Sequence, residues 1–198
     1  MTELEKELME IASTYYETVY KDNRKEMGTY QSPSSYAKSL ADTHDTTVVA
    51  CAIRPNHKAL GVSSARLGKT QHATVELGKT AKEIDNSIPD VVCDYIDTLT
   101  EHTLADLDLT NAEYELDVNG YFNDLYFEGT ADIIIHNADG TITVADLKNY
   151  ANQTERDINI AYWQLAIYAS LVSAKYDKPI KELVMYNPMT RLKEVWTC

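Results

Sequence analysis

The sequence predicts an α/β fold in which a central mixed β-sheet is flanked by helices. Three observations predict it: apolar residues recur at helical spacing early in the chain, a period of two follows from Ala112 to Leu147, and a strongly helical segment at 157–175 precedes one more β-rich run. The chain has 198 residues, of which 44% are hydrophobic. It is therefore long enough to bury a core without a disulfide or a structural metal, and we expect a single domain.

Helices are expected in four segments. Residues 3–20 are expected to form an amphipathic helix. A second helix, residues 65–86, is expected to start after a serine cap at Ser63 or Ser64 and to continue past two glycines. A third, residues 90–101, begins at a proline boundary, and a fourth, residues 157–175, is the most strongly helical stretch of the chain. Residues 21–61 are rich in Ser, Thr and Asn and are expected to form loops with short elements.

Strands are expected where apolar and polar residues alternate or where β-branched residues gather. The expected strands are residues 112–118, 121–127, 130–136, 141–147 and 181–187. Asp139-Gly140 lies between two of these β-rich runs, and Asp-Gly in that position is a strong hairpin signal. The sequence therefore predicts an antiparallel hairpin over Thr130–Leu147.

The net charge of −13 is unevenly distributed along the chain. Between Glu83 and Asp146 there are 16 acidic residues and no lysine or arginine, whereas the rest of the chain has 15 acidic and 18 basic residues. This distribution opposes nonspecific nucleic-acid binding, which depends on the neutralisation of phosphates by Lys and Arg. A nucleic-acid function would need a local basic patch or bound metal ions.

Targeting and cysteine signals are absent from the sequence. The N-terminus has no basic region followed by an apolar region, and no apolar run approaches the ~20 residues that a membrane span needs, so a cytoplasmic protein is expected. Cys51, Cys93 and Cys198 lie far apart and form no CxxC pair. This argues against a disulfide framework, a zinc ribbon and a cysteine-ligated cluster.

Asp132, Asp146 and Lys148 are the first candidates for chemistry. Asp146 and Lys148 lie two residues apart in a strand and so share a face, with Leu147 directed into the core. A twisted hairpin can bring Asp132 opposite Asp146, and two converging carboxylates favour a shared Mg²⁺ or Mn²⁺. A lysine beside them can orient a water molecule and offset phosphate charge. The structural alternative is a pair of strand-end carboxylates with a lysine as ion-pair partner.

Four motifs in one order resemble the RecB-like branch of the PD-(D/E)XK nuclease superfamily. They are Gly68 to Glu76 with His72 between them, Gly129 to Asp132, Ala145 to Lys148, and Gln164 to Tyr168. The likeness is strongest to small phage and prophage proteins that open with Ser-Pro-Ser-Ser, here Ser32–Ser35. It departs from them at Arg54-Pro55, where these relatives usually have Cys-Pro, and it lacks the four-cysteine cluster of the iron–sulfur members.

The resemblance implies a fold and a set of metal ligands. It implies a restriction-endonuclease-like core at 32–187 within a single domain 1–198, with residues 1–31 as an N-terminal helix and connector. Mg²⁺ or Mn²⁺ would be held by Asp132, Asp146, the Leu147 carbonyl and His72, with Glu76, one helical turn beyond His72, as a further candidate.

The resemblance also implies catalytic roles, and the position of basic residues around the expected site suggests phosphate contacts. Lys148 would position the attacking water, with Gln164 and Tyr168 on one helix face behind the site. Basic residues expected to contact phosphates are Arg54, Lys58, Arg66, Lys69 and Arg156. Residues 149–158 are expected to form a loop over the cleft.

We expect a metal-dependent deoxyribonuclease, and the resemblance implies cleavage that leaves 5′-phosphate ends. Because nothing in the chain resembles a target-recognition domain, an exonuclease acting on DNA ends or single strands is favoured, in phage-type recombination, repair or defence. The chain also lacks helicase motifs, so a helicase or recombination partner protein, or an oligomeric ring, would supply processivity. The alternative is a noncatalytic acidic binding protein, or a pseudo-nuclease subunit, that engages a basic partner through residues 83–146.

Overall fold

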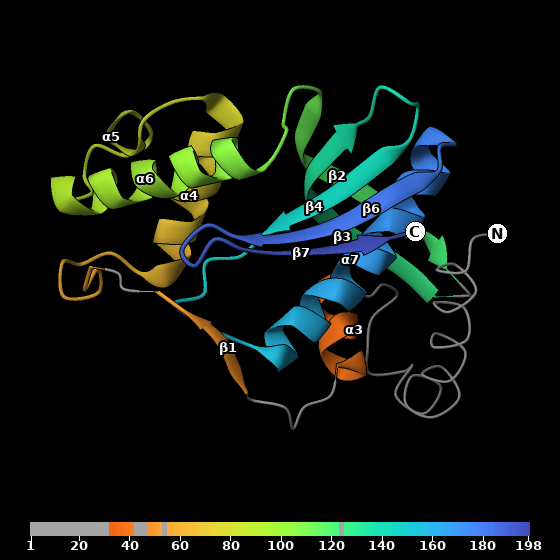
Figure 1. Ribbon diagram of the computed structural model, residues 1–198, viewed down its shortest axis with the longest axis horizontal. Coiled ribbons are helices and arrows are strands. Elements are labelled where there is room, and N and C mark those ends of the chain that lie inside the picture. The colour runs from red at the N-terminus through yellow and green to blue at the C-terminus, as the bar shows by residue number, and fades with distance from the viewer. Residues whose placement is uncertain (1–31, 42–46, 53–54, 123–124) are drawn as a thin grey trace.

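The computed structural model describes residues 32–41, 47–52, 55–122 and 125–198 (Figure 1). The helix expected at residues 3–20 lies outside the described residues. None of the helices within these ranges is long and apolar enough to cross a membrane.

A five-stranded mixed sheet forms the centre of the molecule. Its spatial order is β2-β3-β4-β6-β7. Strands β4 and β6 run parallel, and every other neighbouring pair is antiparallel. The strands are β2 (Ala112–Phe122), β3 (Leu125–His136), β4 (Ile142–Leu147), β6 (Ile180–Asn187) and β7 (Leu192–Thr197). The expected α/β class with a mixed sheet flanked by helices is confirmed.

Helices cover the sheet in two groups (Figure 1). The long helix α7 (Glu155–Tyr176) crosses one face together with α3 (Pro33–Leu40). Helices α4 (Ser64–Leu77), α5 (Ala81–Ile84) and α6 (Asp90–Asp106) pack on one another at one end of the molecule. The parallel β4–β6 pair explains the long helix, because a parallel connection needs a crossover of a dozen or more residues, and α7 supplies it.

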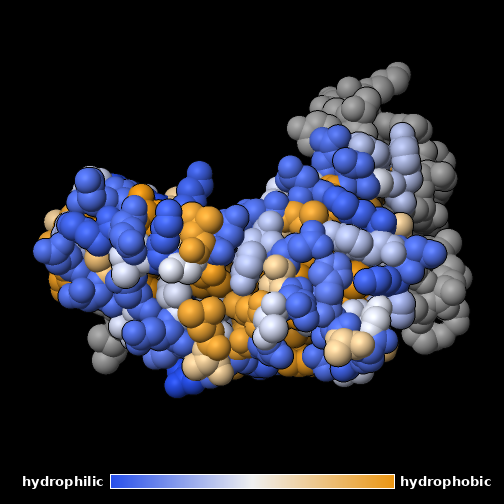
Figure 2. Space-filling view, turned by 90° about the horizontal axis from the view of Figure 1, so that it is seen from above, coloured by the Kyte–Doolittle hydropathy of each residue, from blue (hydrophilic) through white to orange (hydrophobic). Residues whose placement is uncertain are grey.

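The core is divided between these layers. One apolar cluster lies between α7 and the sheet and includes Phe127, Val144 and Leu165. A second joins the other side of the sheet to α4 through Leu147 and Val75, and a third lies among α4, α5 and α6. All six side chains of β4 are buried, as expected for a strand covered on both faces. Outside the core the surface is mainly hydrophilic, with apolar side chains gathered near the middle of the face in Figure 2.

The hairpin predicted over Thr130–Leu147 is present as the β3–β4 pair. Gly140 has φ of 86°, a left-handed conformation that glycine adopts without steric cost. The Asp139 carboxylate accepts hydrogen bonds from the amide and hydroxyl of Thr141. The Asp-Gly signal therefore specified this turn for the expected reason.

Three expected helix and strand limits are wrong. The helix expected to reach Asn86 ends at Leu77, because Gly78 adopts the left-handed C-cap conformation with φ of 61°. The expected helix 90–101 continues to Asp106. The expected strand 121–127 is instead the point where the chain reverses, since Phe122 pairs with Leu125 across the β2–β3 turn.

Two features were not expected. Strand β7 follows the last expected strand and pairs with β6. Residues 149–158 do not form the expected loop, because β5 (Asn152–Thr154) pairs with β1 (Val48–Cys51) in a separate two-stranded sheet and α7 begins at Glu155. Only the few residues between β4 and β5 are irregular.

Gly129 on β3 allows the sheet and α7 to approach closely, and we expect Gly129→Ala to destabilise the protein. An added Cβ would lie 2.8 Å from the Tyr168 hydroxyl and 3.1 Å from Pro33 Cδ. Overpacking of this kind costs about 1–3 kcal/mol of unfolding free energy, which urea denaturation measures.

The matched control for this prediction is Gly68→Ala in helix α4. There an added Cβ would be 3.6 Å from Asn149 Nδ2, an ordinary contact, so the helix should gain about 0.5–1 kcal/mol. Equal stabilities of the two variants would contradict this prediction, because they would show that a Cβ at Gly129 fits without overpacking.

Candidate active site

Helix α4 brings His72 to the sheet. The helix starts at a side-chain cap, in which the Ser63 hydroxyl accepts a hydrogen bond from the Arg66 amide. Its buried face includes Gln71 and Val75, which pack toward α6 and the sheet. His72 lies beside this face with its side chain 24% exposed, and points across to the strands.

Asp132 lies on β3 next to the last residue that pairs with β4, and its side chain contacts the end of β4. The ladder ends with Ile133 opposite Ala145, and continuing its register puts Asp132 opposite Asp146. Instead of a backbone bond at this point, Asp132 Oδ2 accepts a hydrogen bond from the Leu147 amide at 3.0 Å. The predicted juxtaposition of Asp132 and Asp146 is therefore consistent with the strand register.

Asp146, Lys148 and Gln164 form a compact network under α7. Lys148 Nζ donates to Asp146 Oδ1 at 3.0 Å and to Gln164 Oε1 at 3.2 Å, and it lies 2.8 Å from Asp146 Oδ2. Gln164 Nε2 donates to Asp146 Oδ1 at 3.3 Å. Asp146 is only 2% exposed, so this network holds a charged pair inside the protein.

Tyr168 packs behind this network, one helical turn after Gln164. It is buried and its hydroxyl is in hydrogen-bond contact with Ser34 and Gln164. Burial and the nearby Asp132 and Asp146 carboxylates raise the pKa of Tyr168 to about 12. The Ser-Pro-Ser-Ser segment is thus joined to the site through Tyr168.

The electrostatics of the site are dominated by buried charge. Burial, and then repulsion by Asp146, raise the pKa of Asp132 to about 7. Burial disfavours the Lys148 ammonium, but attraction to Asp146 outweighs this and the pKa of Lys148 is raised overall. Lys148 is therefore charged at neutral pH, whereas Asp132 exchanges its proton near neutrality.

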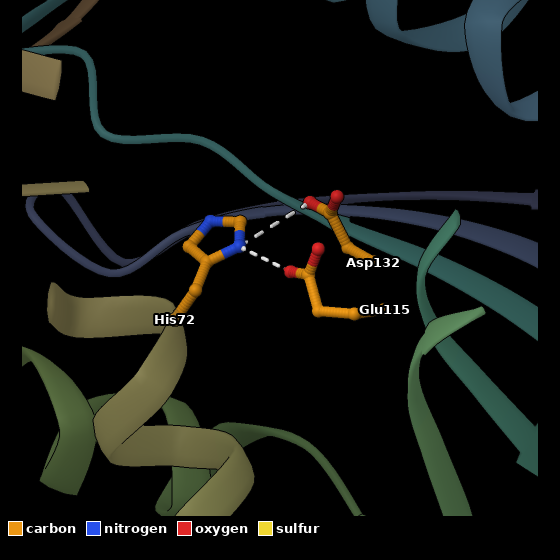
Figure 3. Close-up of side chains that lie close together, drawn as sticks. All are labelled: His72, Glu115 and Asp132. Carbon is orange, nitrogen blue, oxygen red and sulfur yellow. Dashed lines mark hydrogen bonds and ion pairs between the residues drawn. The ribbon is translucent and has the colours of Figure 1, made fainter. Parts of the chain in front are cut away.

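Glu115 on β2 is a site residue that the sequence reasoning missed. His72 Nδ1 lies 3.3 Å from Glu115 Oε1 and 4.0 Å from Asp132 Oδ2 (Figure 3). Among the described residues, one His/Cys/Asp/Glu group has its ligand atoms within 4.8 Å of one another, and it consists of these three side chains. Had the β2–β3 turn been recognised, counting back along the hairpin would have placed Glu115 opposite Asp132.

The backbone at Glu115 explains where its side chain points. Glu115 has φ of 48°, a left-handed conformation that is uncommon for a residue with a Cβ. As a result Tyr114 packs with the cluster on the α4 side and Leu116 with the cluster under α7, although residues two apart in a regular strand share a face. Glu115 is therefore the residue at which the side chains of β2 change from one face of the sheet to the other.

A cleft of about 450 Å³ lies over this group. His72, Glu115 and Asp132 line it together with Lys69 and Glu76 from α4. Glu76 is exposed and does not belong to the three-residue group.

The predicted phosphate-binding residues are scattered. Lys69 lines the cleft, but the Arg66 guanidinium is engaged by Asp85 and Ser87. Lys58 is exposed on a turn, and Arg156 is half-buried at the start of α7. Arg54 lies outside the described residues. Of the four members of this set that the structure describes, Lys69 alone lines the cleft.

A hydrogen bond ties the two halves of the site together. Asn149, which follows Lys148, donates through Nδ2 to Gln71 Oε1 at 3.2 Å. Gln71 is fully buried and precedes His72. This contact fixes the end of β4 relative to the helix that carries the histidine.

The donor set fits a divalent cation. Asp146 Oδ2 is buried, and beyond the Lys148 ammonium at 2.8 Å it has no hydrogen-bond partner among the described residues, although a carboxylate oxygen can accept more than one bond. Asp132, Glu115 and Asp146 offer carboxylate oxygens and His72 offers an imidazole nitrogen, ligands that suit Mn²⁺ and, for the oxygens, Mg²⁺.

One comparison with known proteins identifies the family of this chain. Residues 52–194 match the family model described as the PD-(D/E)XK nuclease superfamily, whose nucleases use divalent metals. Among solved structures, the crystal structure of SSO0001 matches with a TM-score of 0.39 and 16% identity, over 98% of this chain and 75% of that one. No curated protein matches.

Lys148→Met should destabilise the protein, because it leaves the buried Asp146 carboxylate without its cation. Removal of one partner of a buried pair costs about 3–5 kcal/mol of unfolding free energy. Adding Asp146→Asn should recover part of this loss. As a control, Lys181→Met breaks the exposed pair with Asp139 and should cost less than about 1 kcal/mol. Similar losses for the two lysine variants would contradict the buried pair.

The raised pKa of Asp132 predicts a pH-dependent stability in EDTA. Because its folded pKa, about 7, exceeds the unfolded value of about 3.9, the contribution of this group is complete below about pH 4 and is lost as pH rises through 7. Asp132→Asn does not titrate, so it should become more stable than wild type by ~1–3 kcal/mol across this window. Urea denaturation of both proteins from pH 4 to 8 measures the difference, and a constant difference would count against the raised pKa.

Proposed function

Because the chain belongs to the PD-(D/E)XK nuclease superfamily, we propose that it is a divalent-metal-dependent deoxyribonuclease that hydrolyses phosphodiester bonds. The observation that carries the proposal is the Lys148 ammonium held between the buried Asp146 carboxylate and Gln164, with Asp132 in register on the neighbouring strand. We further propose that it is an exonuclease on DNA ends or single strands in phage-type recombination, repair or defence.

Asp132, Asp146, His72 and the Leu147 carbonyl are the groups that would hold the Mg²⁺ or Mn²⁺ ion. When bound, the ion supplies positive charge that stabilises the pentacovalent phosphate of the transition state. Asp132 and Asp146 have the burial and the mutual repulsion that make such an ion favourable. Glu76, exposed on the wall of the cleft, would act through water.

Lys148 orients the attacking water and offsets phosphate charge in this proposal. Its ammonium is held by two acceptors from different elements, Asp146 on β4 and Gln164 on α7. A fixed ammonium loses little entropy on meeting a phosphate oxygen or a water molecule, which is the benefit of preorganisation. Gln164 and Tyr168 are positioning residues, since they act through Asp146 and Lys148.

The acidic span from Glu83 to Asp146 is compatible with DNA as substrate. Among its described acidic residues, five form ion pairs with Lys or Arg from outside the span: Asp85, Asp90, Asp106, Asp139 and Asp146. These pairs reduce the anionic character of the span, which weakens the alternative of an acidic surface that binds a basic partner. Lys69 at the cleft and Arg156 at the start of α7 are the basic residues we assign to phosphate contacts.

DNA cleavage that depends on both metal and Lys148 is the expected result. Purified protein with Mg²⁺ or Mn²⁺ should degrade end-labelled linear and single-stranded DNA and leave closed circular DNA intact, and EDTA should abolish cleavage. Asp146→Asn and Lys148→Met should each lower the rate by about 10²–10³-fold or more. Lys181→Met, far from the site in its pair with Asp139, should cleave like wild type.

Two outcomes would count against the proposal. Cleavage by Asp146→Asn at the wild-type rate would show that the site is wrongly assigned. Cleavage of closed circles as fast as linear DNA would remove the exonuclease assignment but keep the nuclease. Absence of cleavage together with salt-sensitive binding to a basic protein would favour the noncatalytic alternative.

A further inference from the structure

We propose that Glu115 is an additional ligand to the divalent cation of this site, so that the ion is held jointly from β2, β3 and α4. This inference rests on the proposed function, because it concerns the metal that the proposed nuclease uses. Glu115 belongs to none of the four motifs on which the sequence assignment depends.

The geometry brings Glu115 to the metal-binding residues. Its Oε1 lies 3.3 Å from His72 Nδ1, which in turn lies 4.0 Å from Asp132 Oδ2. One ligand atom from each of the three side chains lies within 4.8 Å of the others. Figure 3 shows the imidazole facing both carboxylates across the space between helix and strands.

The charges in the site favour a cation at this position. Asp146 has its own counter-ion in Lys148, whereas the ion pairs of Glu115 and Asp132 among the described residues are both made with His72. A neutral imidazole leaves two carboxylates facing each other without compensation. A divalent cation bound between them removes this repulsion, and His72 Nδ1, which faces both carboxylates, is the nitrogen ligand.

A second observation points to the same cation. Asp146 is 2% exposed, and its Oδ2 lies 2.8 Å from the Lys148 ammonium without any further hydrogen-bond partner among the described residues. Continuing the β3–β4 register beyond Ile133 and Ala145 places Asp146 opposite Asp132, so the two carboxylates are neighbours. Asp132 thus has the Asp146 carboxylate on one side and Glu115 on the other, and a divalent cation beside Asp132 reduces the repulsion among the three carboxylates.

The donor set selects among divalent ions. One imidazole and at least two carboxylates suit Mn²⁺, which accepts nitrogen and oxygen ligands, better than Ca²⁺ or Mg²⁺, which prefer oxygen alone. We therefore expect Glu115 to matter for Mn²⁺ binding in the absence of DNA.

The test is a Mn²⁺ titration of the full chain without DNA, followed by the electron paramagnetic resonance signal of free Mn²⁺. Glu115→Gln should raise the dissociation constant by about tenfold or more. Glu115→Asp, which keeps the charge on a shorter side chain, should lie between Glu115→Gln and wild type. Glu128→Gln, an exposed carboxylate on β3 that lies outside the cleft, should stay within about twofold of wild type and controls for net charge.

A second variant is needed in case Glu115→Gln does not fold, and its new residue has to tolerate the left-handed backbone at this position. If circular dichroism shows that Glu115→Gln is unfolded, Glu115→Asn replaces it, because asparagine tolerates positive φ. The same tenfold criterion then applies to Glu115→Asn.

The remaining outcomes separate this inference from the proposed function. Wild-type affinity in Glu115→Gln, with binding lost in Asp132→Asn, would overturn the role of Glu115 and leave the metal site intact. Equal weakening in Glu115→Gln and Glu128→Gln would also overturn it, since net charge alone would then explain the effect. If wild type bound no Mn²⁺, both the inference and the metal-dependent nuclease would be wrong.

Discussion

The ion pair between Asp146 and Lys148 is the interaction on which the site depends. Both groups are largely buried, with side chains 3% and 16% exposed, and a buried charge is tolerated only when it is paired and hydrogen-bonded. Gln164 completes the arrangement by bonding to both partners. Burying this ion pair under a long helix costs stability. Such a cost is expected if the two charges act on a substrate.

The rest of the fold positions this pair. The parallel β4–β6 pairing requires the crossover helix α7, which brings Gln164 and Tyr168 over the end of β4. Gly129 allows Tyr168 to approach β3, and Tyr168 links the site to α3 through Ser34. On the opposite side, the bond between Asn149 and Gln71 ties the end of β4 to α4. Elements from most of the described chain therefore converge on a few polar groups.

The sequence predicted the parts of this arrangement that have local signals. Asp139-Gly140 specified the hairpin, the spacing of Asp146 and Lys148 specified their common face, and the apolar run of α7 specified the helix. Gly78 shows the limit of such signals, because a glycine in a helical pattern can be tolerated or can end the helix, and here it ends it. The β1–β5 pairing joins segments distant in sequence, and no local pattern announces it. Glu115 was missed because the β2–β3 turn was not recognised, so its position opposite Asp132 could not be counted. Its left-handed backbone also has no signature in the sequence, because it is not a glycine.

The most direct test of the account is the position of a bound Mn²⁺ ion in crystals of the protein, located by anomalous scattering. The account predicts one strong peak bordered by Asp132, His72 and Glu115 on one side and by Asp146 on the other, and loss of that peak in crystals of Asp132→Asn. A peak remote from Asp132, or the same peak in Asp132→Asn, would contradict it.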